Sequence, residues 1–366
     1  MNTGAVSFLD RLEKELPSEH RQHALSLREN YSNRLWHQLT ETLLLFYNTP
    51  SLSVFYVDLY QQFVQSVGME LDQIKLTKMA RNTAASLQEA DPQASCELMA
   101  SLIPKLAASK EATALATLYT GLFLVRAQKV DEAEECLSVF KTIQQASLDE
   151  IQTTLHLLRA EIAEKRNSHN EYYANMLQYL SLVGVSSLER EEYEAVLHKL
   201  CVSSLVGDDV FCFGDLVSLA SEECPGSDSL FFYLKSFHQN RFDVFPRFLE
   251  TVNTRADLAP FAEKIKKKIT TVALVRKVTE MVRLGGCEIS LKTLSEFLGL
   301  SLGTTEMLLV DSFILGILAG KINQKTNTAR IARIKPTTMD DTQLLQLKES
   351  LDRWVEKHEP ALSEEI

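Results

Sequence analysis

The sequence predicts a mainly α-helical protein, and three observations support this prediction. The chain of 366 residues contains only 13 Gly and 9 Pro, which argues against an all-β or loop-rich fold. Leu, Ala, Glu, Lys and Gln are abundant, and these residues favour helices. Apolar residues recur at spacings of three and four along nearly all of the chain before residue 284, as in amphipathic helices.

The first hundred residues predict a series of amphipathic helices. Apolar residues from Leu35 to Phe46 form a stripe, and Pro50 ends it. Asp91 and Pro92 mark the start of a later helix, because Asp caps helix N-termini and Pro is favoured at the first helical position. The expected helices of this part cover residues 7–16, 17–31, 35–46, 53–66, 72–88 and 91–107.

From residue 111 the expected helices come in pairs joined by short turns. Four residues early in the second helices, Ala133, Tyr173, Phe213 and Phe245, are separated by 40, 40 and 32 residues. Tetratricopeptide and armadillo repeats have about 34 to 47 residues, and such helix pairs bury their apolar faces by stacking on their neighbours. Residues 1–259 therefore predict a right-handed, tetratricopeptide-like (TPR-like) helical-repeat solenoid; the alternative is an irregular helical domain without true repeats. The pairs cover residues 111–128 with 130–145, 148–165 with 170–183, 187–205 with 213–220, and 230–239 with 242–252.

Residues 260–336 predict a different module. A linking helix begins at Pro260 and ends at Gly285–Gly286, and Pro336 closes the module. Between these limits, a short strand, two helices across a Ser/Gly turn and a two-stranded ribbon predict a winged helix, a variant of the helix-turn-helix. These elements cover residues 287–290, 291–298, 304–318, 320–324 and 329–334.

The second helix of this module does not have the composition of a DNA reader. Such a helix presents Arg, Lys, Asn or Gln to base edges, whereas residues 304–318 contain Glu306 and Asp311 and no Lys or Arg. The helix is apolar nearly all round, and we expect it to be buried on several sides. We therefore predict a module for protein assembly and expect no nucleic acid. The apolar residues are Met307, Leu308, Leu309, Val310, Phe313, Ile314, Leu315, Ile317 and Leu318.

Charge is unevenly distributed along the chain. The net charge is −11, yet residues 262–335 carry 13 Lys and Arg against 6 Asp and Glu. The basic run Lys264–Lys268 is compatible with nucleic-acid binding or nuclear import. We favour a solvated helix face, or a surface that meets an acidic partner subunit, because no aromatic residues alternate with the lysines.

Residues 337–366 predict a separate C-terminal helix with an acidic tail. Leu344, Leu347, Leu351 and Trp354 are spaced three, four and three residues apart, as in the apolar seam of a coiled coil. Because this helix follows a finished domain, we expect the seam to bind a partner helix. The alternative is that the helix folds back on the solenoid of its own chain.

The sequence contains no motif that indicates catalysis, a cofactor or a metal. It lacks the Ser-nucleophile, phosphate-loop, dinucleotide and zinc-protease patterns. The six cysteines show no C-x-x-C pair and predict free thiols, which are typical of a reducing compartment. The N-terminal residues do not resemble a secretory signal, and no run approaches the ~20 apolar residues that span a bilayer. We expect a non-enzymatic protein without cofactor, membrane segment or small-molecule substrate.

A helical solenoid, a linking helix, a winged helix and a terminal helix together resemble the PCI domain, a family found in the proteasome lid, the signalosome and translation initiation factor three. Residues 291–298 and 318–325, with Gly320 before the ribbon, resemble its winged-helix signature. Arg34–Thr40, Ser168–Tyr173 and Gly207–Leu216 are similar to motifs of one family of proteasome lid subunits.

The resemblance implies a non-catalytic scaffold of the 26S proteasome lid, in the cytoplasm and nucleus, that acts in ubiquitin-dependent protein degradation. Its partners would be other PCI and lid subunits, which pack through their winged helices and gather their terminal helices in a bundle. The ribbon would offer a strand edge to a neighbour. Less favoured alternatives are a subunit of the signalosome or initiation factor three, and a nucleic-acid binder. The expected interface residues are Ala329, Arg330, Ile331, Arg333, Leu344, Leu347, Leu351 and Trp354.

Overall fold

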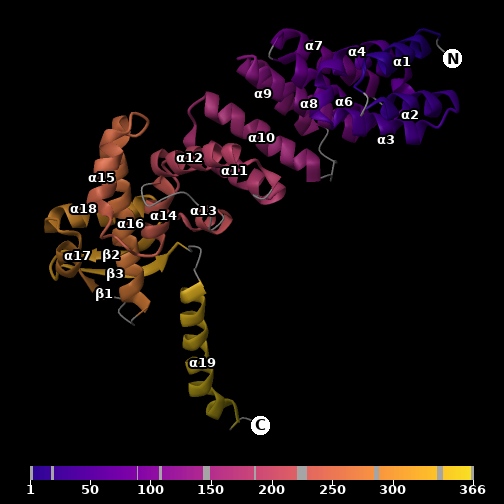
Figure 1. Ribbon diagram of the computed structural model, residues 1–366. Coiled ribbons are helices and arrows are strands. Elements are labelled where there is room, and N and C mark those ends of the chain that lie inside the picture. Colours follow the sequence, from indigo (N-terminus) through magenta and orange to yellow (C-terminus); the bar gives the residue numbers. More distant parts are fainter. Residues whose placement is uncertain are drawn as a thin grey trace. The chain divides into compact units, whose positions relative to one another are not determined.

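The computed structural model confirms that the protein is mainly helical (Figure 1). It describes residues 3–17, 20–88, 90–106, 109–142, 149–184, 187–220, 229–283, 288–335 and 341–363. The chain forms two compact units, Met1–Glu171 and Tyr172–Ile366. The predicted breaks at Gly285–Gly286 and Pro336, and the cysteines Cys224 and Cys287, lie outside the described residues. The cysteines Cys96, Cys136, Cys201 and Cys212 are free thiols.

The first unit is built from helices that follow the apolar periodicity of the sequence. One predicted helix, residues 53–66, is instead divided into 3-10, α and π segments. The Tyr47 hydroxyl donates to the carbonyl of Tyr56 at 3.1 Å, and the Tyr56 hydroxyl donates to the carbonyl of Thr49 at 2.7 Å. These tertiary bonds satisfy backbone acceptors on both sides of the 3-10 turn and so stabilise a segment that is not a regular helix. The elements are α1 (Thr3–Glu15), α2 (Arg21–Ser32), α3 (Trp36–Tyr47), η1 (Pro50–Phe55), α4 (Tyr56–Leu59), η2 (Tyr60–Val64), α5 (Gln65–Val67), η3 (Gly68–Glu70), α6 (Gln73–Gln88), α7 (Pro92–Leu102), η4 (Ile103–Leu106), α8 (Lys110–Arg126), α9 (Val130–Thr142) and α10 (Asp149–Lys165).

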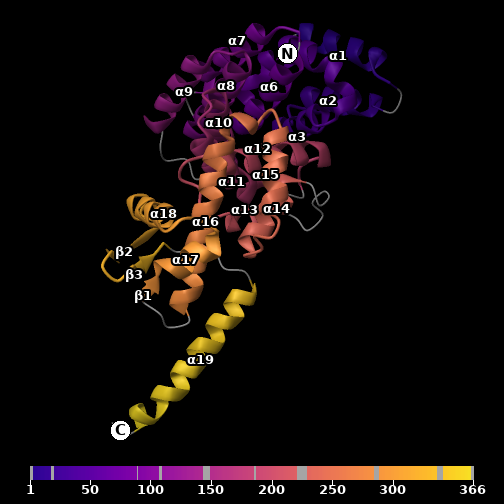
Figure 2. The same ribbon diagram turned by 90° about the vertical axis from the view of Figure 1, so that its left-hand side faces the viewer.

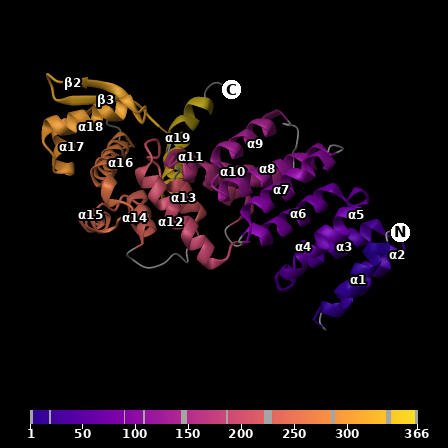
Figure 3. The same cartoon turned by 90° about the horizontal axis from the view of Figure 1, so that it is seen from above.

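Helix α8 is the central helix of the first unit, where it packs against α7, α9 and α10 (Figure 3). Residues around nearly its whole circumference are buried. Gly121 allows the close approach of α10, because a Cβ at this position would lie 2.7 Å from Cδ2 of Leu158. The predicted cap of α7 is confirmed: the Asp91 carboxylate accepts from the amides of Gln93 and Ala94, both at 3.0 Å.

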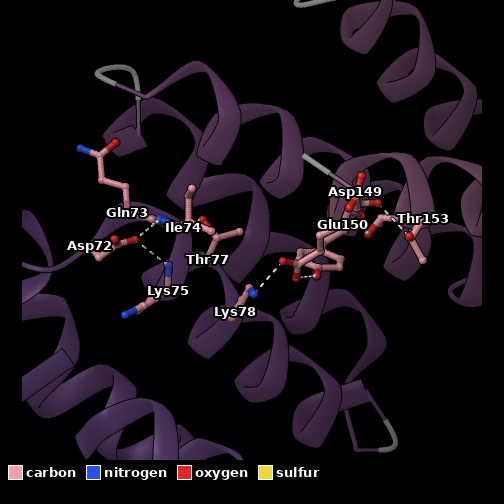
Figure 4. A network of polar contacts seen from close by, with 11 residues as sticks. Asp72, Gln73, Ile74, Lys75, Thr77, Lys78, Asp149, Glu150 and Thr153 are labelled. Carbon is pink, nitrogen blue, oxygen red and sulfur yellow. Dashed lines mark hydrogen bonds and ion pairs between the residues drawn. The ribbon is translucent and has the colours of Figure 1, made fainter. Parts of the chain in front are cut away.

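Glu150 joins three helices of the first unit (Figure 4). Its carboxylate from α10 forms an ion pair with Lys78 of α6 at 2.6 Å and accepts a hydrogen bond from the hydroxyl of Tyr119 on α8 at 3.1 Å. Asp72 caps the start of α6, accepting from the amides of Ile74 and Lys75. The Glu150 carboxylate therefore ties α6 and α8 to the first turn of α10.

The second unit begins with a series of helices, of which α12 and α15 pack against the long helix α16. Helix α11 crosses the boundary between the units. The side chains of Tyr233, Phe237 and Phe248 form an aromatic cluster, in which the rings of Phe237 and Phe248 lie 5.1 Å apart and edge to face. Figure 2 shows α14, α15 and α16 side by side. The elements are α11 (His169–Val183), α12 (Arg190–Val206), α13 (Gly214–Leu219), α14 (Leu230–His238), α15 (Phe245–Thr254), η6 (Ala259–Phe261) and α16 (Ala262–Arg283).

A small α/β module follows, with the elements β1 (Glu288–Ser290), α17 (Leu291–Leu298), α18 (Leu302–Ile314), β2 (Leu318–Asn323) and β3 (Thr328–Ile334). The three strands form an antiparallel sheet in the order β1-β3-β2, and Ala329 lies opposite both Ile289 and Ile322. The core of the module also includes Leu274 and Val278 of α16. Helix α18 begins earlier than predicted, because the Ser301 hydroxyl accepts from the amide of Thr304 and caps it.

The pairing of β2 with β3 shifts register between Ala319 and Gly320. A Cβ at Gly320 would collide with the backbone carbonyl of Arg330 on the neighbouring strand. The irregularity therefore requires glycine, for a steric reason, at the position that the sequence places just before the ribbon.

Helix α19 (Asp341–Ser363) is the last element. Within the described part of the chain, no single helix is long and apolar enough to cross a bilayer. The pair α17 and α18, bent by 101°, reaches the necessary length and composition together. Leu291, Leu294 and Leu309 of this pair are nevertheless buried in the core of the α/β module.

Candidate protein-interaction site

The ribbon residues expected at an interface divide into two groups. The side chains of Ala329 and Ile331 are buried in the core of the module, whereas Arg330 and Arg333 are exposed. The expectation that this strand offers a free edge is wrong for Ala329 and Arg330, because β3 is the central strand and pairs with both β1 and β2. Among the described strands, β1 and β2 each pair with β3 alone, so each has an unpaired outer side, and that of β2 is the longer.

The outer face of the sheet is basic. Lys321 of β2 lies directly opposite Arg330 of β3, and both side chains are exposed. Like charges directly opposite each other destabilise a sheet. Glu288 of β1 lies on the other side of Arg330 and offsets part of this repulsion. Lys321 was absent from the predicted interface residues, and only the strand register shows that it adjoins Arg330.

Helix α18 differs from its prediction. It is not buried on several sides: the buried residues Thr305, Leu308, Leu309 and Ser312 occupy one face. On the other face the side chains of Met307 and Ile314 are 69% and 76% exposed, and that of Val310 is also exposed. A helix with apolar residues all round has several faces that can be buried, but the composition does not show which of them the chain itself covers. In this chain the fold covers one face. We name Met307, Val310 and Ile314 the α18 stripe; exposed apolar groups of this kind mark interaction sites.

The seam residues of α19 are exposed. Leu344, Leu347, Leu351 and Trp354 lie along this helix, and the indole of Trp354 is 60% exposed. Val355 extends the same apolar face and is exposed as well. Ordered helices of a single chain seldom expose such a series of large apolar residues, so the seam has the character of a helix-packing surface.

The basic run at the start of α16 contacts its own chain. Lys264 pairs with Asp208 at 2.7 Å, and Lys267 pairs with Asp311 of α18 at 2.8 Å. Lys268 is 6% exposed, and its ammonium donates to the carbonyls of Ser204 at 2.6 Å and Gly207 at 2.5 Å. Burial, and to a smaller extent the neighbouring Lys264, lowers the pKa of Lys268 to about 7. Three of the four lysines of this run therefore contact the chain itself, which weakens the main argument for nucleic-acid binding.

The described residues include no group of three or more His, Cys, Asp or Glu side chains that could hold a metal ion. The histidines His20 and His23 stack on each other at 5.9 Å, as their spacing on a helix suggests. The exposed surfaces of the second unit that suit contacts with a partner protein include the strand edge of β2, the basic outer face of the sheet, the α18 stripe and the α19 seam.

Comparison with known proteins gives consistent matches along the chain. The family described as PSD13 N-terminal repeats matches residues 23–221. The 26S proteasome non-ATPase regulatory subunit 13 of Dictyostelium discoideum is 23% identical, over 98% of this chain and 95% of the relative. Homolog B of this subunit in Arabidopsis thaliana is 25% identical, over 93% and 92%. The probable 26S proteasome regulatory subunit rpn9 of Schizosaccharomyces pombe is 21% identical, over 97% and 94%.

Proposed function

The chain belongs to the family of 26S proteasome non-ATPase regulatory subunit 13, and from this premise we propose that it is a non-catalytic scaffold of the proteasome lid. In this role it acts in ubiquitin-dependent protein degradation, in the cytoplasm and nucleus. Its partners are other lid subunits that contain PCI domains. The observation that carries the proposal is the exposed apolar seam of α19, because a scaffold must present surfaces that only a neighbouring subunit covers.

The proposed architecture has three parts. Residues 1–259 form a TPR-like solenoid, residues 260–336 the linking helix and the winged helix of a PCI module, and residues 337–366 a bundle helix with its tail. The repeat positions support the solenoid, since Ala133, Tyr173 and Phe213 are buried within the first five residues of α9 and α11 or next to α13, whereas the fourth position, Phe245, is half-buried at the start of α15. The order β1, α17, α18, β2, β3 supports the winged helix.

Two surfaces contact different partners in this proposal. The α19 seam of Leu344, Leu347, Leu351 and Trp354 packs in a helix bundle. The winged helix meets the neighbouring PCI subunit through Arg330 and Arg333 on its outer face and through the edge of β2. Ala329 and Ile331 are buried and act by holding β3 in place between its neighbours.

Substitution of the seam tests the scaffold role. The variant Leu347→Asp/Leu351→Asp places two carboxylates in the seam, and we expect the full chain to lose co-purification with lid subunits. Leu345→Asp is the control, because Leu345 is another exposed leucine of α19 but lies outside the three-four spacing; Leu347→Asp alone is compared with it at equal charge. These variants alter exposed side chains and should leave the thermal unfolding of the isolated chain unchanged. Normal incorporation of the double variant into the lid would contradict the proposal.

A further inference from the structure

The second unit contains a cavity of about 460 Å³ that the proposed interfaces do not use. Its walls come from α11, the segment 209–212, α13, α16 and the ends of the α/β module. Two motifs singled out in the sequence meet here: Tyr173 ends the stretch Ser168–Tyr173, and Asp209 to Asp215 belong to Gly207–Leu216. The volume lies in the range of pockets that bind small ligands or short peptide segments.

The strongest sign of a ligand is the hydroxyl of Tyr173. The side chain is only 6% exposed, and its hydroxyl is buried without a hydrogen-bond partner among the residues that the structure describes. A buried hydroxyl that stays unsatisfied destabilises a fold, and native proteins rarely keep one without reason. Burial, with a smaller effect of Asp215, raises the pKa of Tyr173, so the hydroxyl is neutral and can donate as well as accept.

The charges around the cavity restrict the kind of ligand. Asp209 and Asp215 contribute carboxylates, whereas Arg276 and Lys335 contribute cations. The carboxylates would repel a polyanion such as a nucleotide, and the guanidinium and ammonium would repel a polycation, so neither kind of ligand suits the cavity. The remaining wall is apolar, with Phe211, Val275 and Ile317 among its residues. A ligand that suits all of these groups has donors, acceptors and an apolar part.

We propose that this cavity receives a short peptide segment of another protein, with one apolar side chain against Phe211, Val275 and Ile317 and a polar group on the Tyr173 hydroxyl. A peptide backbone carries N–H donors for the carboxylates and C=O acceptors for Arg276 and Lys335, which matches both signs of charge. The inference rests on the proposed function, because the segment is expected from a neighbouring lid subunit.

Tyr173→Phe tests the role of the hydroxyl, because the substitution should stabilise the isolated chain and yet weaken its association with the partner. In the isolated chain, removal of an unpartnered buried hydroxyl should raise the midpoint of thermal unfolding. In the complex, loss of one hydrogen bond should weaken association with the partner roughly fivefold. Tyr233→Phe is the control, because the Tyr233 hydroxyl lies 3.2 Å from the Thr251 hydroxyl within the chain, and its removal should lower the midpoint. A Tyr173→Phe variant that melts at a lower temperature and binds normally would overturn the proposal.

A photo-cross-link identifies the occupant directly. The photoreactive residue p-benzoyl-phenylalanine replaces Lys335 in the full chain, the native complex is purified and irradiated, and the linked peptide is sequenced by mass spectrometry. We expect a single segment of another subunit, and its yield should fall when Val275→Phe fills the cavity. A link to the chain's own residues, or a yield that Val275→Phe leaves unchanged, refutes the inference. Co-purification with lid subunits is read from the same sample, so failure of the proposed function is recognised separately.

Discussion

The substitution Gly320→Ala should destabilise the α/β module by forcing two strands apart. Gly320 lies on β2 at the register shift, and an added Cβ would meet the carbonyl oxygen of Arg330 together with the Cα of Ile331. Both atoms belong to the backbone of the central strand, so neither can move away by a change of rotamer. Relief requires β2 to move away from β3, which weakens the hydrogen bonds around the irregularity.

The magnitude follows from two opposing contributions. Overpacking of this kind costs about 1–3 kcal/mol. Replacement of Gly in a strand recovers about 0.5–1 kcal/mol of backbone entropy. Because the contact is with backbone, the upper part of the overpacking range applies, about 2–3 kcal/mol, and the net loss in the free energy of unfolding is about 1–2.5 kcal/mol. This loss lowers the unfolding midpoint by roughly 2–10 °C in a unit of this size.

The assay is thermal and urea unfolding of the full chain beside the matched variant Gly303→Ala. Gly303 lies in the first turn of α18, and among the described residues no heavy atom lies within 4 Å of a Cβ built there. Alanine at this position should stabilise the helix by up to about 1 kcal/mol. If Gly320→Ala unfolds at the same temperature as Gly303→Ala, the close approach of β2 and β3 does not exist and the reasoning is wrong.

Three further predictions concern a buried lysine, a helix cap and an exposed surface. The pKa of Lys268 falls from 10.5 to about 7 on folding, so between these pH values the unfolded chain binds more protons than the folded chain. The free-energy cost of burying the charged lysine is therefore complete below pH 7 and falls to zero as the pH approaches 10.5. In urea unfolding, the stability of the unchanged protein should rise between pH 7 and 10.5 by at most about 1.4 kcal/mol per pH unit, and Lys268→Met should lack this rise. An identical pH profile for both proteins would contradict the shift. Asp91→Ala removes two hydrogen bonds from the start of α7 and should lower stability by about 1 kcal/mol, whereas Asp91→Asn should retain most of it. Met307→Glu/Ile314→Glu should leave the unfolding midpoint of the isolated chain nearly unchanged, since both residues are exposed, yet reduce incorporation into the lid; Met307→Leu/Ile314→Leu is the control, and equal incorporation of both pairs would exclude the α18 stripe from the interface.

The sequence by itself determined the local structure. Helical periodicity acts over one or two turns, so it predicts helices such as α17, which spans Leu291–Leu298 as expected. Asp91 caps α7 because a cap bond also involves only neighbouring residues. The match to the lid-subunit family likewise depends on residue order, and the motifs Arg34–Thr40 and Gly207–Leu216 are recognisable from the sequence alone. Short-range rules suffice wherever the deciding contacts are close in sequence.

Only the tertiary structure decided which surfaces of these elements are covered. Strand order in the sheet depends on pairing between residues about forty positions apart, and it made β3 central, with β1 and β2 as the outer strands. The composition of α18 is apolar on several faces, so no periodicity distinguishes the face on the sheet from the exposed α18 stripe. From the sequence Lys268 belongs to a basic surface, but folding places the carbonyls of Ser204, in the last turn of α12, and of Gly207, just after it, against its ammonium. The sequence likewise does not show that the Tyr173 hydroxyl lacks a hydrogen-bond partner among the described residues, because its neighbours are set only when distant segments pack together.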